Sequence, residues 1–269
     1  MGLTERDMTM KGKAIVMGAT SGIGREVALC LAERGWQVGV AGRREDRLDE
    51  LMDCSRGGIV ASMRIDVTQE DAPDHLRDLI ARMGGMDLYF HSSGIGWQNE
   101  TLDMEKELAT VETNCMGFVR MVDTAYRWFA EQAQNEANAD APASSGTHAR
   151  YRIACITSIA GTKGLGAAPA YSSTKRFQNH YLECLAQQSH MRRLPIAITD
   201  LRPGFVRTDL IAGSRYPLQL DARMVAKKIV HALERGCETK VIDWRYALLV
   251  VLWRLVPRWL WTRLSVTSQ

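Results

Sequence analysis

The chain has 269 residues, of which 46% are hydrophobic and 24% charged, and its formal net charge is +3. This composition is typical of a globular protein with an ample core, and it excludes wholesale disorder and fibrous repeats. The near balance of acidic and basic residues gives no reason to expect nucleic acid as a partner.

Six cysteines are scattered singly, without any C-x-x-C pair, so the sequence predicts neither a metal site nor a redox dithiol. Residues 1–13 are polar and contain no apolar signal segment. We therefore expect a reducing, cytoplasmic location.

Apolar runs of strand length alternate along the chain with longer stretches of helical period. The predicted strands are 14–17, 36–41, 59–65, 87–91, 152–157, 196–201 and 239–242. The predicted helices are 23–34, 45–54, 68–83 with Thr68 as its cap, 104–133, 168–191 and 222–234. This alternation favours an α/β fold, a doubly wound parallel sheet of seven strands with helices on both faces.

The stretch 132–149 is polar, rich in Ala, Ser and Asn, and without periodicity. We expect a mobile surface insertion there, because the strand order resumes directly after it. The predicted organisation is one domain over 1–243, followed by an amphipathic tail over 244–269.

The first predicted strand leads into the glycine-rich turn 18–24, GATSGIG, and then directly into a helix. Glycines at this spacing allow a tight turn and a close approach of the backbone to a pyrophosphate, and the start of the helix offers free N–H groups. A plain turn is the alternative, but the position between the first strand and the first helix favours dinucleotide binding.

The second strand ends in Gly42-Arg43-Arg44, without the acidic residue that would bond a ribose and repel a 2′-phosphate. A guanidinium pairs with a phosphate through two hydrogen bonds. The sequence therefore favours NADP(H) over NAD(H), the alternative being two solvated arginines that open a charged helix.

Tyr171 and Lys175 lie four residues apart near the start of a predicted helix, so they project from one face. Ser158 follows the fifth strand, at the sheet edge where open α/β folds bind ligands. An ammonium near a phenol lowers the pKa of the phenol from its usual value of about 10, which suits such a pair to acid–base chemistry. An exposed pair without a function is the plain alternative.

Together these residues resemble the short-chain dehydrogenase/reductase family over roughly residues 13–242. The matching motifs are the glycine turn, Asp66-Val67, Asn114, Ser158, Tyr171-x-x-x-Lys175 and Pro203-Gly204. The resemblance implies a Rossmann-fold oxidoreductase of the NADP-preferring type, in which Asn114, Ser158, Tyr171 and Lys175 form the catalytic tetrad.

The resemblance also implies individual roles. Asn114 would hold a water that links Lys175 to solvent, and Lys175 would also hold the nicotinamide ribose. Asp66 would bond the adenine amino group, and Thr208 the nicotinamide carboxamide. The full set of predicted cofactor-binding residues is Gly18, Thr20, Ser21, Gly22, Ile23, Gly24, Arg43, Arg44, Asp66, Val67, Ser93, Gly94, Asn114, Tyr171, Lys175, Pro203, Gly204, Val206 and Thr208.

One motif departs from the family pattern. The chain has His91-Ser92-Ser93-Gly94 where the family has Asn-Asn-Ala-Gly. Gly94 keeps the close backbone approach to the cofactor, and Ser92 or His91 is expected to replace the lost asparagine bridge between strands. We interpret His91 as structural rather than catalytic.

The tail holds four of the seven tryptophans and four arginines, with no acidic residue. Its longest apolar run, 246–253, has eight residues, whereas a membrane-spanning helix needs about 20. Pro257 is expected to break or kink a helix. Two interpretations stay open: an element in a membrane interface, or an arm that packs on its own core or on another subunit.

The favoured function is an NADPH-dependent oxidoreductase that interconverts a carbonyl and a secondary alcohol on an apolar, lipid-like substrate. We expect a homodimer or homotetramer, and one of the two open interpretations of the tail adds peripheral membrane contact through 244–264. The alternatives are a catalytically silent NADP(H)-binding sensor, which the presence of Tyr171 and Lys175 disfavours, and a membrane-peripheral scaffold. The expected substrate pocket is formed by 95–97, 162–169 and 205–220.

Overall fold

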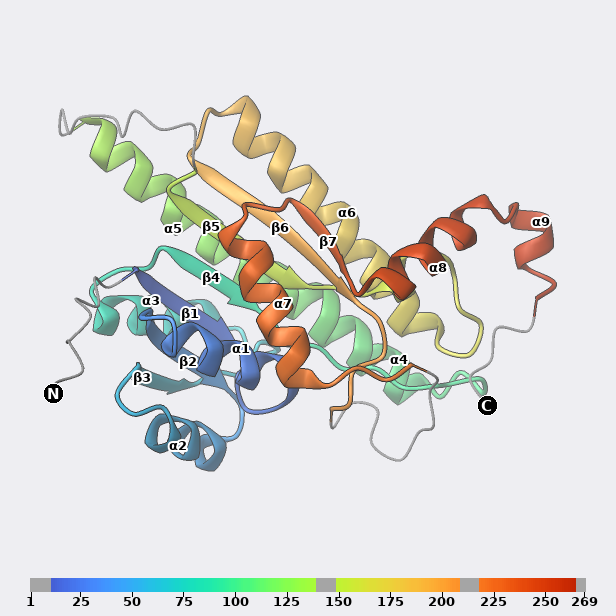
Figure 1. Cartoon of the computed structure of the whole chain (residues 1–269), viewed down its shortest axis with the longest axis horizontal. Helices are drawn as coiled ribbons and strands as arrows, with labels where there is room; N and C mark the ends of the chain where they lie inside the picture. Colours follow the sequence, from blue (N-terminus) through green and yellow to red (C-terminus); the bar gives the residue numbers. More distant parts are fainter. Residues whose placement is uncertain (1–10, 139–148, 209–217, 265–269) are drawn as a thin grey trace, which may run out of the picture.

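The computed structural model describes residues 11–138, 149–208 and 218–264. Seven parallel strands form one sheet in the order β3-β2-β1-β4-β5-β6-β7 (Figure 1). The all-parallel pairing and this order confirm the predicted doubly wound sheet. The strands are β1 (Lys13–Met17), β2 (Gln37–Gly42), β3 (Ile59–Arg64), β4 (Leu88–His91), β5 (Tyr151–Ile156), β6 (Ile196–Pro203) and β7 (Thr239–Ile242).

Helices cover both faces of the sheet. One face carries α1 (Gly22–Ala32), α2 (Glu45–Cys54) and α7 (Ala222–Glu234), and the other carries α3 (Ala72–Met83), α5 (Phe118–Asn138) and α6 (Pro169–Met191). The remaining helical elements are α4 (Met104–Val111), the π-helical turn η1 (Glu112–Gly117), the 3₁₀ turn η2 (Ile159–Gly161), α8 (Trp244–Leu255) and α9 (Arg258–Trp261).

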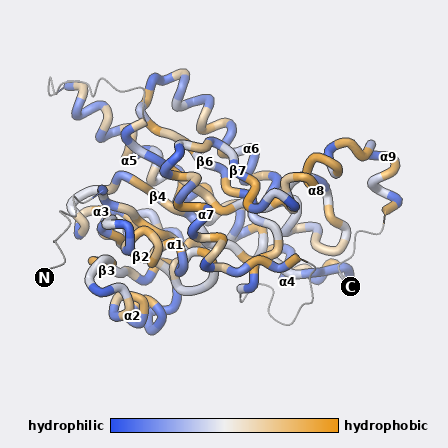
Figure 2. Tube along the Cα trace, in the orientation of Figure 1, coloured by the Kyte–Doolittle hydropathy of each residue, from blue (hydrophilic) through white to orange (hydrophobic). Residues whose placement is uncertain are grey.

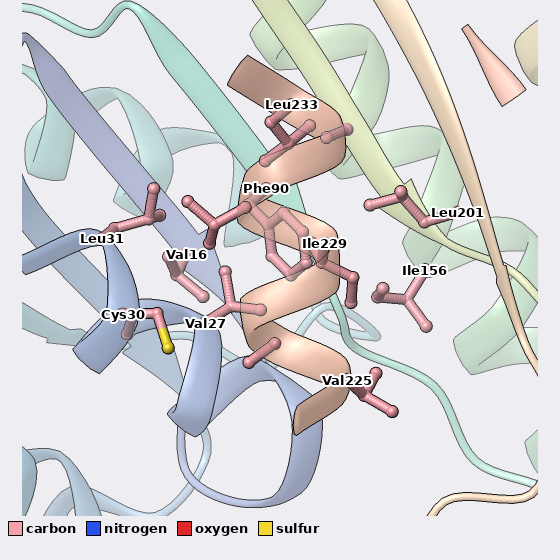
Figure 3. Close-up of a cluster of buried hydrophobic side chains, with 14 of the residues drawn as sticks. Val16, Val27, Cys30, Leu31, Phe90, Ile156, Leu201, Val225, Ile229 and Leu233 are labelled. Carbon is pink, nitrogen blue, oxygen red and sulfur yellow. The ribbon is translucent and has the colours of Figure 1, made fainter. Parts of the chain in front are cut away.

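The core consists of two apolar layers, one on each side of the sheet. Successive residues of a strand point to opposite faces, so Val16 lies in one layer while Ile15 and Met17 lie in the other. Figure 3 shows the first layer, where Phe90 lies between the sheet and α7. Burying each such side chain contributes about 1.5–3 kcal/mol. The continuous burial of β1 is why its sequence is apolar without alternation.

The start of α3 differs from the prediction. Thr68 does not cap this helix, which begins at Ala72 after Asp71. The backbone N–H and the hydroxyl of Thr68 both donate to Oδ1 of Asp66, at 3.1 and 2.8 Å. Residues 66–71 are thus a turn held by an aspartate, and the prediction of Thr68 as a helix cap is wrong.

The long helix predicted over 104–133 is a run of three elements, α4, η1 and α5. The π-helical turn η1 lies between the two α-helices, and α5 continues to Asn138. The first residues of the stretch expected to be a surface insertion are therefore helical, and 139–148 lie outside the described residues.

The tail forms α8 and α9, which extend away from the sheet beyond β7 (Figure 1). Pro257 separates the two helices, as predicted. Tyr246 and Val250 of α8 are buried in the apolar layer that α7 covers. Within the described residues, no helix has the length and apolar character needed to cross a membrane.

Candidate active site

The turn after β1 is as tight as its glycines predict. Gly18 and Gly22 have φ of 82° and 55°, a region that favours glycine. A Cβ at Gly18 would lie 2.6 Å from the backbone nitrogen of Ser93, and one at Gly24 would overlap the carbonyl oxygen of Gly18. The turn therefore packs backbone to backbone against the end of β4, and no larger residue fits at these positions.

The start of α1 suits an anionic group. Ser21 precedes the helix without a side-chain capping bond to any described residue, so the first N–H groups of α1 are available to a ligand. Thr208 lies directly against this start, because a Cβ at Gly22 would be 2.9 Å from its methyl carbon. The fold thus brings the glycine turn and the segment after β6 together, and this arrangement fits a dinucleotide.

Two arginines follow β2. Nη2 and Nε of Arg44 donate to the hydroxyl of Thr20 in the glycine turn, at 3.1 and 3.3 Å. Arg43 is exposed, and its guanidinium makes no hydrogen bond or ion pair within the described part of the chain. At the neighbouring end of β3, Asp66 is half-buried and Val67 is buried against Gly117.

Tyr171 and Lys175 share one face of α6, as their spacing predicts. Nζ of Lys175 lies 5.7 Å from the centre of the Tyr171 ring. The ring also lies over the backbone of Gly96, where a Cβ would overlap it. Gly96 therefore leaves the space that the ring occupies.

Ser158 lies at the end of β5, where it caps η2. Its Oγ accepts a hydrogen bond from the backbone N–H of Ala160 at 3.0 Å, and the residue is buried. The hydroxyl of Ser172 lies 2.9 Å from the carbonyl oxygens of both Ala160 and Lys163. These contacts fix the segment after Ser158 to the first turn of α6, which carries Tyr171.

Lys175 is fully enclosed. Its Nζ donates to Oε1 of Gln178 at 2.9 Å and to the carbonyl oxygen of Ile156 at 3.3 Å. Burial lowers the pKa of Lys175 to about 8, because an ammonium loses its hydration inside the protein. The lysine therefore titrates close to neutral pH.

Asn114 is held through both its side chain and its backbone. Its amide exchanges two hydrogen bonds with the backbone of Ile95, at 2.9 and 2.7 Å. Its backbone carbonyl accepts from Nε2 of Gln178 at 2.8 Å. The carboxamide of Gln178 thus joins the side chain of Lys175 to the backbone of Asn114. Sequence reasoning missed Gln178, although its position three residues after Lys175 places both on one helix face.

His91 and Ser92, the first two residues of the motif that departs from the family pattern, make contacts inside the protein. His91 is buried, and its Nδ1 lies 3.0 Å from the hydroxyl of Tyr89. Burial lowers the pKa of His91 to about 3, so its ring is neutral at neutral pH. The backbone N–H of Ser92 donates to the carbonyl oxygen of Met17 at 2.8 Å, which joins the ends of β4 and β1.

A buried polar network lies next to the site and joins α6 to the sheet. Oδ1 of Asp200 accepts from the hydroxyl of Thr157 at 2.5 Å, and that hydroxyl accepts from the amide of Asn179 at 2.8 Å. Arg202 pairs with Asp200 at 2.6 Å. Thr157 directly follows β5, Asn179 lies in α6, and Asp200 and Arg202 lie in β6. The network therefore fixes the helix that carries Tyr171 and Lys175 to the sheet.

A tyrosine–lysine pair beside a dinucleotide-type glycine turn defines a class of nicotinamide-dependent oxidoreductases. The sequence profile described as short chain dehydrogenase matches residues 12–217. The chain therefore belongs to the short-chain dehydrogenase/reductase family, and it is an NAD(P)-dependent oxidoreductase.

Relatives agree with this assignment. The chain is 28% identical over 251 residues to an "uncharacterized oxidoreductase" of Myxococcus xanthus, covering 91% of this chain and 92% of that protein. It is 28% identical over 266 residues to an "uncharacterized oxidoreductase" of Mycobacterium tuberculosis, covering 91% of this chain and 94% of that protein.

Solved structures share the fold. A short-chain dehydrogenase/reductase from Burkholderia phymatum in complex with NAD superposes with a TM-score of 0.76 at 18% identity, covering 92% of this chain and 94% of that one. An actinorhodin polyketide ketoreductase with NADPH superposes with a TM-score of 0.69 at 22% identity, covering 86% of this chain and 95% of that one.

Proposed function

We propose that the protein interconverts a carbonyl and a secondary alcohol with NADP(H), using Asn114, Ser158, Tyr171 and Lys175 as its catalytic tetrad. The observation that carries this proposal is the Tyr171–Lys175 pair, 5.7 Å apart between ring centre and Nζ, at the sheet edge that also holds the glycine turn. That edge is where doubly wound sheets bind their ligands.

A nicotinamide held at this edge would supply the hydride that the carbonyl carbon takes up in the reduction. The Tyr171 hydroxyl donates a proton to the carbonyl oxygen, and it takes the proton back in the oxidation. The hydroxyl of Ser158 bonds the same oxygen and holds it in line. The Lys175 ammonium, held by Ile156 and Gln178, favours the phenolate that remains.

The choice of NADP(H) rests on the end of β2. Arg43 is exposed without a partner among the described residues, and Arg44 is fixed to Thr20 at the edge of the glycine turn. Two guanidinium groups at this position favour a 2′-phosphate, and no carboxylate in Gly42-Arg43-Arg44 opposes it. A fluorescence titration tests this choice, and equal affinity for NADH and NADPH would overturn it.

The proposal of an apolar substrate is based on the apolar side chains around the site. Ile95 and Trp97 follow β4, and Trp97 is 43% exposed. The ring of Phe205 lies 6.4 Å from that of Tyr246 in α8, whose hydroxyl donates to the carbonyl oxygen of Leu218 at 2.9 Å. Residues 209–217 of the predicted pocket lie outside the described residues.

A carbonyl panel tests the substrate class. NADPH oxidation is followed with small sugars, fatty acyl ketones and steroids at matched concentrations. We expect kcat/KM to rise with apolar surface, since each buried methylene contributes about 0.8 kcal/mol. A preference for small sugars would contradict an apolar substrate while leaving the oxidoreductase assignment in place.

The homodimer or homotetramer is supported by exposed apolar side chains on neighbouring helices. Leu108 and Val111 of α4, Met116 of η1 and Phe177 of α6 are exposed, and α4 and η1 both pack against α6. Light scattering of the full chain tests this state, and a monomer at micromolar concentration would contradict it. The cytoplasmic location stays a prediction.

A further inference from the structure

One side of α8 exposes an unbroken apolar face. Its members are between 52% and 75% exposed, and their spacing of three or four residues places them on one side of the helix. Trp259 and Leu264 continue the exposed apolar surface around α9. Figure 2 shows α8 as hydrophobic over most of its length. We call these residues the arm face: Trp244, Leu248, Val251, Leu252, Leu255, Trp259 and Leu264.

The arm face belongs to a firmly held element. On the opposite side of α8, Tyr246 and Val250 are buried in the core, and the Tyr246 ring lies against Gly204. In α9, Nε1 of Trp261 donates to the carbonyl oxygen of Gly164 at 2.7 Å. One apolar side of α8 packs on the core of its own domain, and the second apolar side is left exposed to solvent.

The charged side chains within the segment that carries the arm face are all arginines. Residues 244–264 contain four arginines and no acidic residue. Arg245 pairs with Asp243, and Arg263 lies 5.8 Å from the Trp259 ring centre. The guanidinium groups of Arg254 and Arg258 make no hydrogen bond or ion pair within the described ranges. An apolar surface bordered by such cations fits an interface with acyl chains below and anionic headgroups above.

We propose that the arm face docks the enzyme onto an anionic lipid surface. The twelve residues of α8 then lie in the plane of the interface, with the apolar side in the acyl region and Arg254 and Arg258 among the headgroups. A second copy of the chain fits less well, because a symmetric pair presents the same patch twice and brings like charges together.

The segment of α8 and α9 also contacts the loop between Ser158 and Tyr171, which lies beside the site. Nζ of Lys163 donates to the carbonyl oxygen of Val256 at 2.8 Å and lies 5.9 Å from the Trp261 ring centre. Lys163 and Gly164 belong to the segment between Ser158 and Tyr171. A carbonyl dissolved in the lipid thus meets the site at the surface where the enzyme is docked. This delivery rests on the proposed function, whereas the docking itself does not.

Flotation of the full chain with vesicles tests the docking. The vesicles contain phosphatidylcholine alone or with about one-third phosphatidylglycerol, and we expect about tenfold or more tighter binding to the anionic ones. The variant Leu252→Glu/Leu255→Glu is expected to lose binding by more than about tenfold, because charges replace inserted leucines. The matched control Leu102→Glu/Met191→Glu changes equally exposed apolar residues outside the arm and is expected to keep binding.

Two readouts separate the possible outcomes. NADPH titration and turnover of a water-soluble carbonyl are expected to be unchanged in Leu252→Glu/Leu255→Glu, so lost binding with kept turnover supports docking even if the substrate class is wrong. The proposal is overturned if the wild type binds neither kind of vesicle, if it binds both equally, or if the arm variant binds as the wild type does. It is also overturned if the arm variant only lowers the light-scattering mass, which would make a second copy the occupant.

Discussion

Nζ of Lys175 donates a hydrogen bond to Oε1 of Gln178 at 2.9 Å, between two side chains that are both almost completely buried. The other end of the same carboxamide donates to the backbone carbonyl of Asn114. An acceptor in this position favours the ammonium form of Lys175, whereas burial disfavours it. Gln178 is therefore a positioning residue that sets both the orientation and the charge of the lysine.

Substitution of Gln178 is expected to move the pH profile. The ammonium form of Lys175 is lost as pH rises through its pKa of about 8, so activity falls on the alkaline side. Gln178→Leu removes an acceptor from the charged form, which lowers this pKa and moves the alkaline limb of kcat/KM to lower pH by about one unit. Gln178→Glu places a buried negative charge beside the ammonium and moves the limb to higher pH.

Gln187→Leu is the matched control, because Gln187 is exposed on the same helix. It is expected to leave the profile in place. If Gln178→Leu lowered kcat without moving the alkaline limb, Gln178 would have only a packing role.

Tyr171→Phe is expected to lower kcat by at least about a hundredfold, because the proton donor is lost. NADPH affinity is expected to stay nearly unchanged, as measured by fluorescence titration. Lys175→Met is expected to lower both kcat and NADPH affinity, since the lysine serves both. Near wild-type turnover of Tyr171→Phe would refute the assignment of the acid–base residue.

Gly96→Ala is expected to lower kcat by more than about tenfold, because the new Cβ would overlap the Tyr171 ring and displace it from a near-attack position. Steady-state kinetics of the variant and the wild type check this, and equal kcat values would show that the ring tolerates the shift.

Arg43→Ala is expected to weaken NADPH binding by about 1.5–3 kcal/mol, the scale of a hydrogen bond to a charged group. NADH binding is expected to change little, because NADH lacks the 2′-phosphate. Arg47→Ala is the control, since Arg47 is another exposed arginine in the next turn. A parallel loss for both cofactors would place Arg43 outside the discriminating contact.

Asp243→Asn is expected to lower the free energy of unfolding at neutral pH. Asp243 accepts from Lys228 at 3.0 Å and from Nε of Arg245 at 2.8 Å, and these bonds hold its pKa well below the usual value of about 4. The stabilisation is complete above that usual value and is lost as pH falls through the lower, folded-state pKa. Urea unfolding at pH 7 and pH 3 is expected to show a smaller difference at pH 3, and an equal difference would exclude the charge as its source.

Most of the fold could be predicted because the alternation of buried strands and amphipathic helices is a local pattern. The helices 45–54 and 222–234 and the strand 239–242 have the predicted bounds. The start of α3 could not be predicted in the same way, because Thr68 and Asp71 are both residue types that favour the N-cap position. In the structure Thr68 is hydrogen-bonded to Asp66, and the helix begins after Asp71. The choice depends on a side-chain contact that periodicity does not carry.

Some residues of the candidate site could also be predicted from local patterns, whereas others could not. Tyr171, Lys175 and Ser158 follow from spacing and strand ends, but a lone glutamine inside a helix has no motif of its own. Gln178 matters because its carboxamide lies between a buried lysine and a carbonyl from another element. The arm face also needed the structure, since the sequence left open which side of the tail packs on the core.

The direction in which Asn114 points depends on the number of residues in the π-helical turn η1. A π turn holds more residues than an α turn, so deleting one residue from Glu112–Gly117 would let the helix continue while rotating α4 about 100° relative to α5. The helix would survive by circular dichroism, yet the asparagine amide would no longer meet Ile95. A measurement of helix content would therefore not detect this deletion. A homologue with the shorter turn would need a different residue to bond the backbone of Ile95.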